Sequence, residues 1–169
     1  MNYHCSVFKR GALAITLSLL LSPIQAAPFE KGDMEASLLV GSGQAFNEDY
    51  TVIGAGFGYY VAQGLKLGID AQSWQGGSVG IKKISPHVTY VLVRNEGLMP
   101  YIGAFYRKTA IDGYEDLDAA GARAGVYLST RNNFYMSVGI AHENYLSCDE
   151  TVYVDCSDTY PEITLSFRL

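Results

Sequence analysis

The feature that most constrains this chain is a strict alternation of apolar residues with polar or small ones, repeated in eight segments after residue 27. In the last segment, residues 162–169, the odd positions are apolar and the even positions are polar or charged. Successive side chains of a β-strand point to opposite faces, so each segment predicts a strand with one apolar face. The region after residue 27 has no apolar spacing of the helical kind, and the chain therefore predicts an all-β fold of eight strands.

The length of the strands and of their connections indicates where such a sheet would reside. Each predicted strand has about ten residues, which is enough to cross a bilayer when the strand is tilted. Three connections are tight turns, at residues 62–64, 94–97 and 130–133, and four are mostly longer, at residues 43–50, 75–79, 110–118 and 145–158. Short turns at one end and longer loops at the other are typical of outer-membrane barrels. We therefore expect an eight-stranded antiparallel up-and-down transmembrane β-barrel.

Residues 1–26 predict a cleaved secretory signal peptide, which leaves 27–169 as the barrel domain. Lys9 and Arg10 precede an apolar run at residues 11–21, and Ala26 lies in a stretch of small residues suited to cleavage. The run is too short for a spanning helix, although an uncleaved N-terminal anchor is the alternative. After cleavage, 10 basic (12 − 2) and 17 acidic residues remain, a net charge of −7 that disfavours nucleic acid as a partner.

The charges of the alternating segments decide which face meets lipid. A Lys or Arg at the bilayer midplane costs about 2–4 kcal/mol. A lipid-facing polar stripe with Lys83, Arg107, Arg123, Asp70 and Glu143 would therefore cost more than the ~5–15 kcal/mol stability of a typical domain. We therefore expect the apolar face outward and a network of charged side chains in the lumen, consisting of Glu35, Lys66, Asp70, Lys83, Arg107, Arg123, Glu143, Glu162 and Arg168. A lipocalin-like soluble barrel is the opposite choice; the small residues on the polar face and the low charged fraction of 17% disfavour it.

Aromatic residues cluster near the predicted strand ends and predict two girdles at the membrane interfaces. The periplasmic girdle would contain Tyr59, Tyr90, Phe134 and Phe167, and the outer girdle would contain Tyr50, Trp74, Tyr106, Tyr145 and Tyr160.

Three segments resemble the small eight-stranded outer-membrane barrels, the group of the OmpA transmembrane domain and of OmpX and Ail. They are the hairpin GAGFGYYVAQGLKLGID, the strand ISPHVTYVL and the terminal strand YPEITLSFRL. The resemblance implies the outer membrane of a Gram-negative bacterium, with outer-membrane lipids and lipopolysaccharide as partners. It also implies an assembly signal in the last strand, read by the barrel-assembly machinery. Tyr160, Ile163, Leu165, Phe167 and Leu169 match that signal, although the family usually ends in Phe.

Two features of the predicted outer loops are candidates for function. Cys148 and Cys156 would close a nine-residue ring, and in an oxidising compartment they predict a disulfide that stiffens the loop, with a redox switch as the alternative. Ten acidic residues predict a negatively charged rim, which would be solvated, bridge divalent cations to lipid or bind a basic partner. They are Glu48, Asp49, Asp112, Glu115, Asp116, Asp118, Asp149, Glu150, Asp155 and Asp158.

The charged lumen leaves three functional hypotheses open. The lumen of an eight-stranded barrel is just wide enough for its side chains to fill, which favours a packed ion-pair network over a narrow gated pore. The third hypothesis, a lipid A-modifying enzyme, would require a catalytic group such as His142, Glu143 and Asn144 with Ser147, whose spacing does not match such enzymes. His87 is interpreted as a hydrogen-bonded lumen residue.

We therefore predict no catalytic residue, no cofactor and no metal site. The expected protein is a monomeric, non-enzymatic outer-membrane barrel that presents loops for envelope integrity or for contact with an extracellular ligand.

Overall fold

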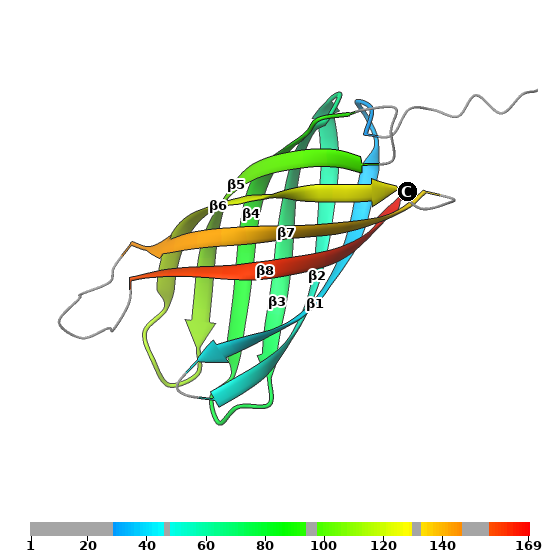
Figure 1. Cartoon of the computed structure of the whole chain (residues 1–169). Coiled ribbons are helices and arrows are strands. Elements are labelled where there is room, and N and C mark those ends of the chain that lie inside the picture. The colour runs from blue at the N-terminus through cyan, green and yellow to red at the C-terminus, as the bar shows by residue number, and fades with distance from the viewer. Residues whose placement is uncertain (1–28, 46–47, 94–97, 130–132, 147–155) are drawn as a thin grey trace, which may run out of the picture.

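The structure, a computed structural model, describes residues 29–45, 48–93, 98–129, 133–146 and 156–169. Eight strands form one closed antiparallel barrel in chain order (Figure 1). They are β1 (Met34–Ala45), β2 (Glu48–Ala62), β3 (Leu65–Gln75), β4 (Ile81–Val91), β5 (Leu98–Ile111), β6 (Leu117–Ser129), β7 (Phe134–Tyr145) and β8 (Ser157–Arg168). The predicted all-β, up-and-down barrel is confirmed. Among the described residues, no helix has the length and apolar character needed to cross a membrane. The predicted signal peptide lies outside the described residues.

The apolar stripe of every strand faces outward. Leu38, Ile53, Ile102 and Ile140 expose about half or more of their surface, from 48% to 62%. The polar stripe faces the lumen, where Glu35, Arg107 and other charged side chains are buried. Because the period of a strand is two, each residue's face follows directly from its position in the alternation.

Three of the predicted loops are shorter in the structure; one of them, 145–158, is bounded by β7 up to Tyr145 and by β8 from Ser157. The expected loop at 43–50 is largely strand, since β1 and β2 remain paired as far as Ala45 and Glu48. The expected loop at 110–118 shortens to residues 112–116 between β5 and β6. Backbone pairing continues beyond the apolar belt, where both faces are polar and the alternation no longer marks a strand. Consequently Glu48, Asp49, Asp118 and Asp158 are strand residues rather than loop residues.

The predicted outer girdle is wrong for four of its five aromatic residues. Tyr106 points outward, but Tyr50, Trp74, Tyr145 and Tyr160 have the parity of the lumen face. Trp74, for example, is two positions from the buried Gln72, and the ammonium of Lys83 lies 4.2 Å from its ring centroid. These four residues lie near the strand ends, as predicted, but their positions in the alternation direct their side chains into the lumen.

A cluster of aromatic rings closes the end of the lumen at which the chain ends. Phe29 precedes β1, is only 2% exposed and packs against the rings of Tyr60, Tyr127 and Tyr135 at centroid distances of 5.4, 5.3 and 4.9 Å. The carbonyl of Phe29 accepts a hydrogen bond from the Gly64 amide, which ties this segment to the turn between β2 and β3. Leu169 donates to the Met34 carbonyl at the same end of the barrel (Figure 1).

Candidate functional site: the charged lumen

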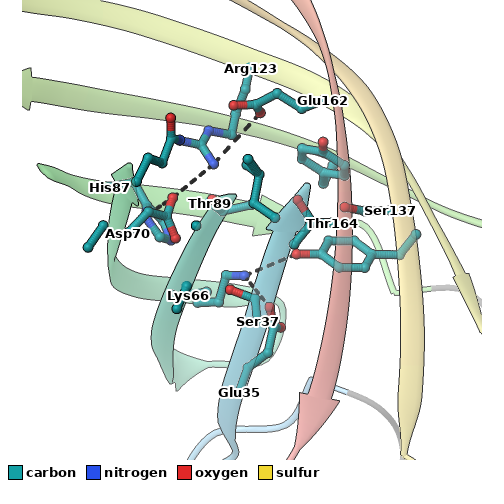
Figure 2. Close-up of a pocket in the computed structure, with 18 residues that line it drawn as sticks. Glu35, Ser37, Lys66, Asp70, His87, Thr89, Arg123, Ser137, Glu162 and Thr164 are labelled. Carbon is teal, nitrogen blue, oxygen red and sulfur yellow. Dashed lines mark hydrogen bonds and ion pairs between the residues drawn. The ribbon is translucent and has the colours of Figure 1, made fainter. Parts of the chain in front are cut away.

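The charged residues of the lumen form three groups along the barrel. The first surrounds Glu35 of β1, which is 3% exposed. Lys66 Nζ donates to Glu35 Oε1 at 2.7 Å, and Tyr60 donates its hydroxyl to Oε2 at 2.7 Å. Ser166 also donates to Oε1. Figure 2 shows Lys66 beside Glu35, and Lys66 also donates to the Tyr127 hydroxyl at 3.0 Å. Both Glu35 oxygens are thus satisfied, as a buried carboxylate requires.

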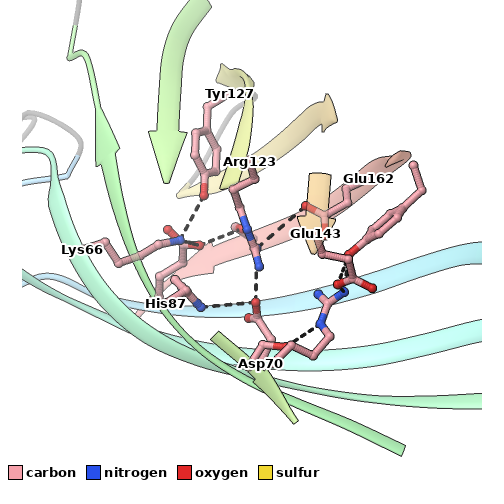
Figure 3. A network of polar contacts seen from close by, with 12 residues as sticks. Lys66, Asp70, His87, Arg123, Tyr127, Glu143 and Glu162 are labelled. Carbon is pink, nitrogen blue, oxygen red and sulfur yellow. Dashed lines mark hydrogen bonds and ion pairs between the residues drawn. The ribbon is translucent and has the colours of Figure 1, made fainter. Parts of the chain in front are cut away.

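The second group lies in the middle of the lumen and centres on Arg123 of β6. Its Nη1 atom lies 3.2 Å from Asp70 Oδ2 and 3.8 Å from Glu162 Oε2 (Figure 3). His87 Nδ1 lies 3.3 Å from the same oxygen of Asp70. The guanidinium stacks on Phe105, 4.8 Å from the ring centroid. Arg123 therefore links β3, β6 and β8 across the lumen.

The third group lies in the half of the lumen away from the C-terminus and centres on Glu143 of β7, which is fully buried. Arg107 Nη1 lies 2.5 Å from Glu143 Oε2, and Lys83 Nζ lies 3.6 Å from Oε1. Arg107 Nε donates to Ser85 Oγ at 2.9 Å, and Tyr160 contacts both Arg107 and Glu143. One carboxylate thus serves two buried cations, so its loss would leave both without their anionic partner.

Glycines of β2 provide the space that these long side chains occupy. A Cβ atom at Gly58 would lie 2.5 Å from Cδ of Lys66, and one at Gly56 would overlap the Asp70 carboxylate. The glycines of the GAGFG segment are therefore explained by lumen crowding.

Little space remains in the centre of the lumen. The cavity between the first and second groups has a volume of about 30 Å³ and is lined by Glu35, Lys66, Asp70, Arg123 and Glu162, among others (Figure 2). Such a volume accommodates a water molecule rather than a solute. The rings around Phe29 lie on one side of it and the Glu143 group on the other. Side chains therefore fill the centre of the lumen.

The structure brings eight of the nine predicted lumen residues into these three groups, four cations with four anions. The ninth, Arg168, lies apart, with Nη1 3.5 Å from Asp33 Oδ2 at the end of the barrel. The hydroxyls of Tyr60, Tyr127 and Tyr160 also join these groups; they were not predicted, although their parity marks them as lumen residues. Phe29 was not predicted either, because no sequence pattern marks it.

Four of the five residues of the predicted assembly signal lie on the outer face. Ile163, Leu165 and Phe167 point outward from β8 and Leu169, directly after it, is exposed, whereas Tyr160 points into the lumen. Their role in assembly stays a prediction. Cys156 directly precedes β8 and Cys148 lies outside the described residues, so the disulfide stays a prediction as well.

The described residues do not assemble the catalytic group considered from the sequence. His142 is exposed on the outer face, with Nδ1 2.7 Å from Thr159 Oγ1, whereas Glu143 points into the lumen. Adjacent strand residues face opposite sides, so these two cannot act on one substrate. Ser147 lies outside the described residues. Within the described part of the chain, no cluster of three or more His, Cys, Asp or Glu side chains could hold a metal ion.

A closed eight-stranded barrel with an apolar exterior and a filled, charged lumen is the fold of the small outer-membrane barrels. No known protein family matches the sequence, and no curated protein matches it. Solved structures do match. The N-terminal β-barrel domain of Pseudomonas aeruginosa OprF has a TM-score of 0.66 at 15% identity and covers 82% of this chain and 98% of its own. Neisserial surface protein A has a TM-score of 0.52 at 14% identity and covers 81% of this chain and 94% of its own. These similarities establish the fold that the sequence resemblance implies.

Proposed function

We propose that this protein is an integral outer-membrane barrel of a Gram-negative bacterium, non-enzymatic, that displays acidic loops at the outer surface. The proposal rests on the distribution of side chains between the two faces of the barrel. Apolar side chains such as Ile102 lie outside and charged ones such as Arg107 lie inside, the reverse of a water-soluble protein. In water, this arrangement would expose a continuous apolar belt, which soluble monomers avoid.

Cell fractionation, with gel migration compared before and after boiling, tests the location. We expect the protein in the outer-membrane fraction, a heat-dependent mobility shift, and protease resistance except at the loops. Processed protein that is soluble in the periplasm without detergent would contradict the proposal.

We further propose that the barrel is a structural scaffold and does not conduct. The filled lumen supports this role, because Phe29 and the Arg107–Glu143 pair obstruct it in two places. Planar-bilayer recording tests it: we expect no reproducible current steps, and regular steps would instead support the narrow pore. Identical lipid A mass spectra from expressing and deleted cells are expected if the protein does not modify lipid A.

Lipopolysaccharide is the partner that the outer face supports best. An apolar groove of about 550 Å³ runs over β1 to β5, where Ala55 and Ala71 are small, and Lys82 and Lys108 lie along it. Acyl chains would lie in the groove while the ammonium groups bind lipid phosphates. Lys108 also pairs with Asp116 at 3.3 Å, a half-exposed contact that a phosphate would compete for.

Co-purification of lipopolysaccharide tests this contact. The double variant Lys82→Gln/Lys108→Gln should carry less lipopolysaccharide than the wild type, whereas Lys31→Gln, an exposed lysine before β1, should not change it. Equal amounts in both variants would contradict a specific contact.

The outer rim supports a role in surface interaction or envelope integrity. Asp112, Glu115 and Asp116 are exposed in the loop between β5 and β6, and Glu48 accepts a hydrogen bond from the Ser78 amide at 2.5 Å. Such a rim would attract a basic partner or divalent cations. We propose that the Cys148–Cys156 disulfide stiffens the loop beside it, and that the barrel-assembly machinery reads the outward residues of β8.

A further inference from the structure

The backbone pairing of the barrel is incomplete at one junction, the seam between β1 and β8. β1 and β8 pair over five residue pairs, from Glu35 and Arg168 to Leu39 and Thr164, and then separate. By contrast, β1 pairs with β2 along its whole length up to Ala45. Figure 1 shows the two strands diverging toward the end opposite the C-terminus. The register of the paired part would place Val40 opposite Ile163 and Ser42 opposite Pro161, but neither pair forms.

Pro161 provides a covalent reason for the separation. The Leu169 amide donates to the Met34 carbonyl, so the odd-numbered residues of β8 direct their backbone groups toward β1. Residue 161 would donate to residue 42, and proline has no N–H. Proline is otherwise found on strand edges whose N–H side is unpaired. Pro161 therefore rules out the hydrogen bond to Ser42, so the sequence of β8 itself keeps this part of the seam unpaired.

A pocket of about 250 Å³ lies behind the seam. Its lining includes Gly41 and Ser42 of β1, Trp74 of β3, and Asp158 and Glu162 of β8. Gly41 has lumen parity, yet it is exposed and a Cβ atom there would meet no atom within 4 Å. Val40 and Ile163, on the outer face at the start of the opening, are 60% and 51% exposed. The pocket therefore opens outward between β1 and β8, in the part of the apolar belt away from the C-terminus.

Two polar atoms at the pocket lack a hydrogen-bond partner among the described residues. Glu162 is 6% exposed and its Oε1 atom is unpartnered, as is the indole Nε1 of Trp74. An unsatisfied buried polar atom costs about 1–3 kcal/mol, and a charged one costs more, so a ligand that donates to Glu162 would recover this cost. Asp158 adds a second carboxylate to the lining, which disfavours an anionic head group.

We propose that the outer part of the β1–β8 seam is a lateral binding site for a single-chain amphiphile with an amine head group. The chain enters between Val40 and Ile163 from the bilayer, and the ammonium group donates to Glu162. The pocket is smaller than the ~300–1,000 Å³ typical of drug-sized ligand sites, which fits one chain end and a small head but no multi-chain lipid. This inference rests on the proposed membrane location.

Trp74 makes the site directly measurable because it is the only tryptophan in the chain. The wild-type protein is reconstituted in phosphatidylcholine vesicles and titrated with stearylamine or stearic acid, each carrying the same doxyl quencher on its chain. We expect stearylamine to quench Trp74 at roughly tenfold lower concentration, the factor for one charge-assisted hydrogen bond. Equal quenching by both probes, or none, would overturn the proposal.

Two variants and one control locate the effect. Gly41→Phe should fill the pocket and abolish quenching, and Glu162→Gln should bring the stearylamine curve close to the stearic acid curve. Ala122→Phe, on the lipid face of β6, should behave as wild type. If Gly41→Phe is quenched as strongly as wild type, the amphiphile is not in the pocket and the proposal fails.

Two further readouts separate the remaining outcomes. The heat-dependent gel shift of each sample reports insertion independently, so loss of the shift would contradict the outer-membrane proposal itself. Quenching by brominated phosphatidylcholine alone would show that bulk lipid occupies the seam, and chemical cross-linking into dimers would show a second copy there. Either result would overturn the amine specificity that we propose.

Discussion

Replacing Glu143 by glutamine tests whether the lumen is an ion-pair network that stabilises the barrel. Glutamine retains the volume of the side chain and removes its charge. In the wild type, Arg107 lies 2.5 Å and Lys83 lies 3.6 Å from the Glu143 carboxylate, and both cations are at least 93% buried. In the variant, neither cation would have this anionic partner. The change therefore leaves two buried cations without compensation while disturbing the packing little.

The expected magnitude follows from this burial. Removing one partner of a buried ion pair costs about 3–5 kcal/mol, since the remaining charge stays desolvated. The half-exposed pair of Lys108 and Asp116 is the matched control, because water screens it and such pairs contribute about 0–1 kcal/mol. Glu143→Gln should thus reduce the free energy of unfolding several times more than Asp116→Asn.

Urea unfolding in lipid vesicles, followed by Trp74 emission and by the heat-dependent gel shift, measures both variants. Adding Arg107→Met to Glu143→Gln should restore part of the loss, because it removes one of the two uncompensated cations. If Glu143→Gln and Asp116→Asn lower the unfolding midpoint equally, the Glu143 group is hydrated and the account of a packed lumen is incorrect.

Four further predictions concern other parts of the barrel. Phe29→Ala should cost about 3–5 kcal/mol, the range for a buried aromatic residue, and an unchanged urea midpoint would show that the ring does not close the lumen. Arg123→Ala should also lower the unfolding midpoint, since it separates Asp70 and Glu162 from their shared cation. Mass analysis of the exported protein with and without reductant should reveal the predicted Cys148–Cys156 bond, and two free thiols would disprove it. Phe167→Asn should lower the amount of folded protein in the outer membrane, measured by the gel shift, if the last strand carries the assembly signal.

Side-chain orientation was predictable from the sequence because it is a local property. Lys66 and Arg107 could be assigned to the lumen from their places in the alternation, since covalent geometry sends successive strand residues to opposite faces. The same rule would have assigned Trp74 and Tyr160 to the lumen, had it been applied to the aromatic residues. The eight strands and their order were predictable for the same reason, with antiparallel neighbours joined by short connections.

The partners of these side chains were decided only by the tertiary structure. Glu35 meets Lys66, 31 residues away, and Asp70 meets Arg123, 53 residues away, because strand tilt and stagger set which levels of the lumen coincide. Arg168 has lumen parity but lies at the barrel end, where Asp33 is its partner. The closing contact of β1 with β8 joins the two ends of the chain, so no local pattern reveals how far it extends. The sequence thus determined the faces of each strand, whereas barrel closure determined the ion pairs, the position of Phe29 and the open seam.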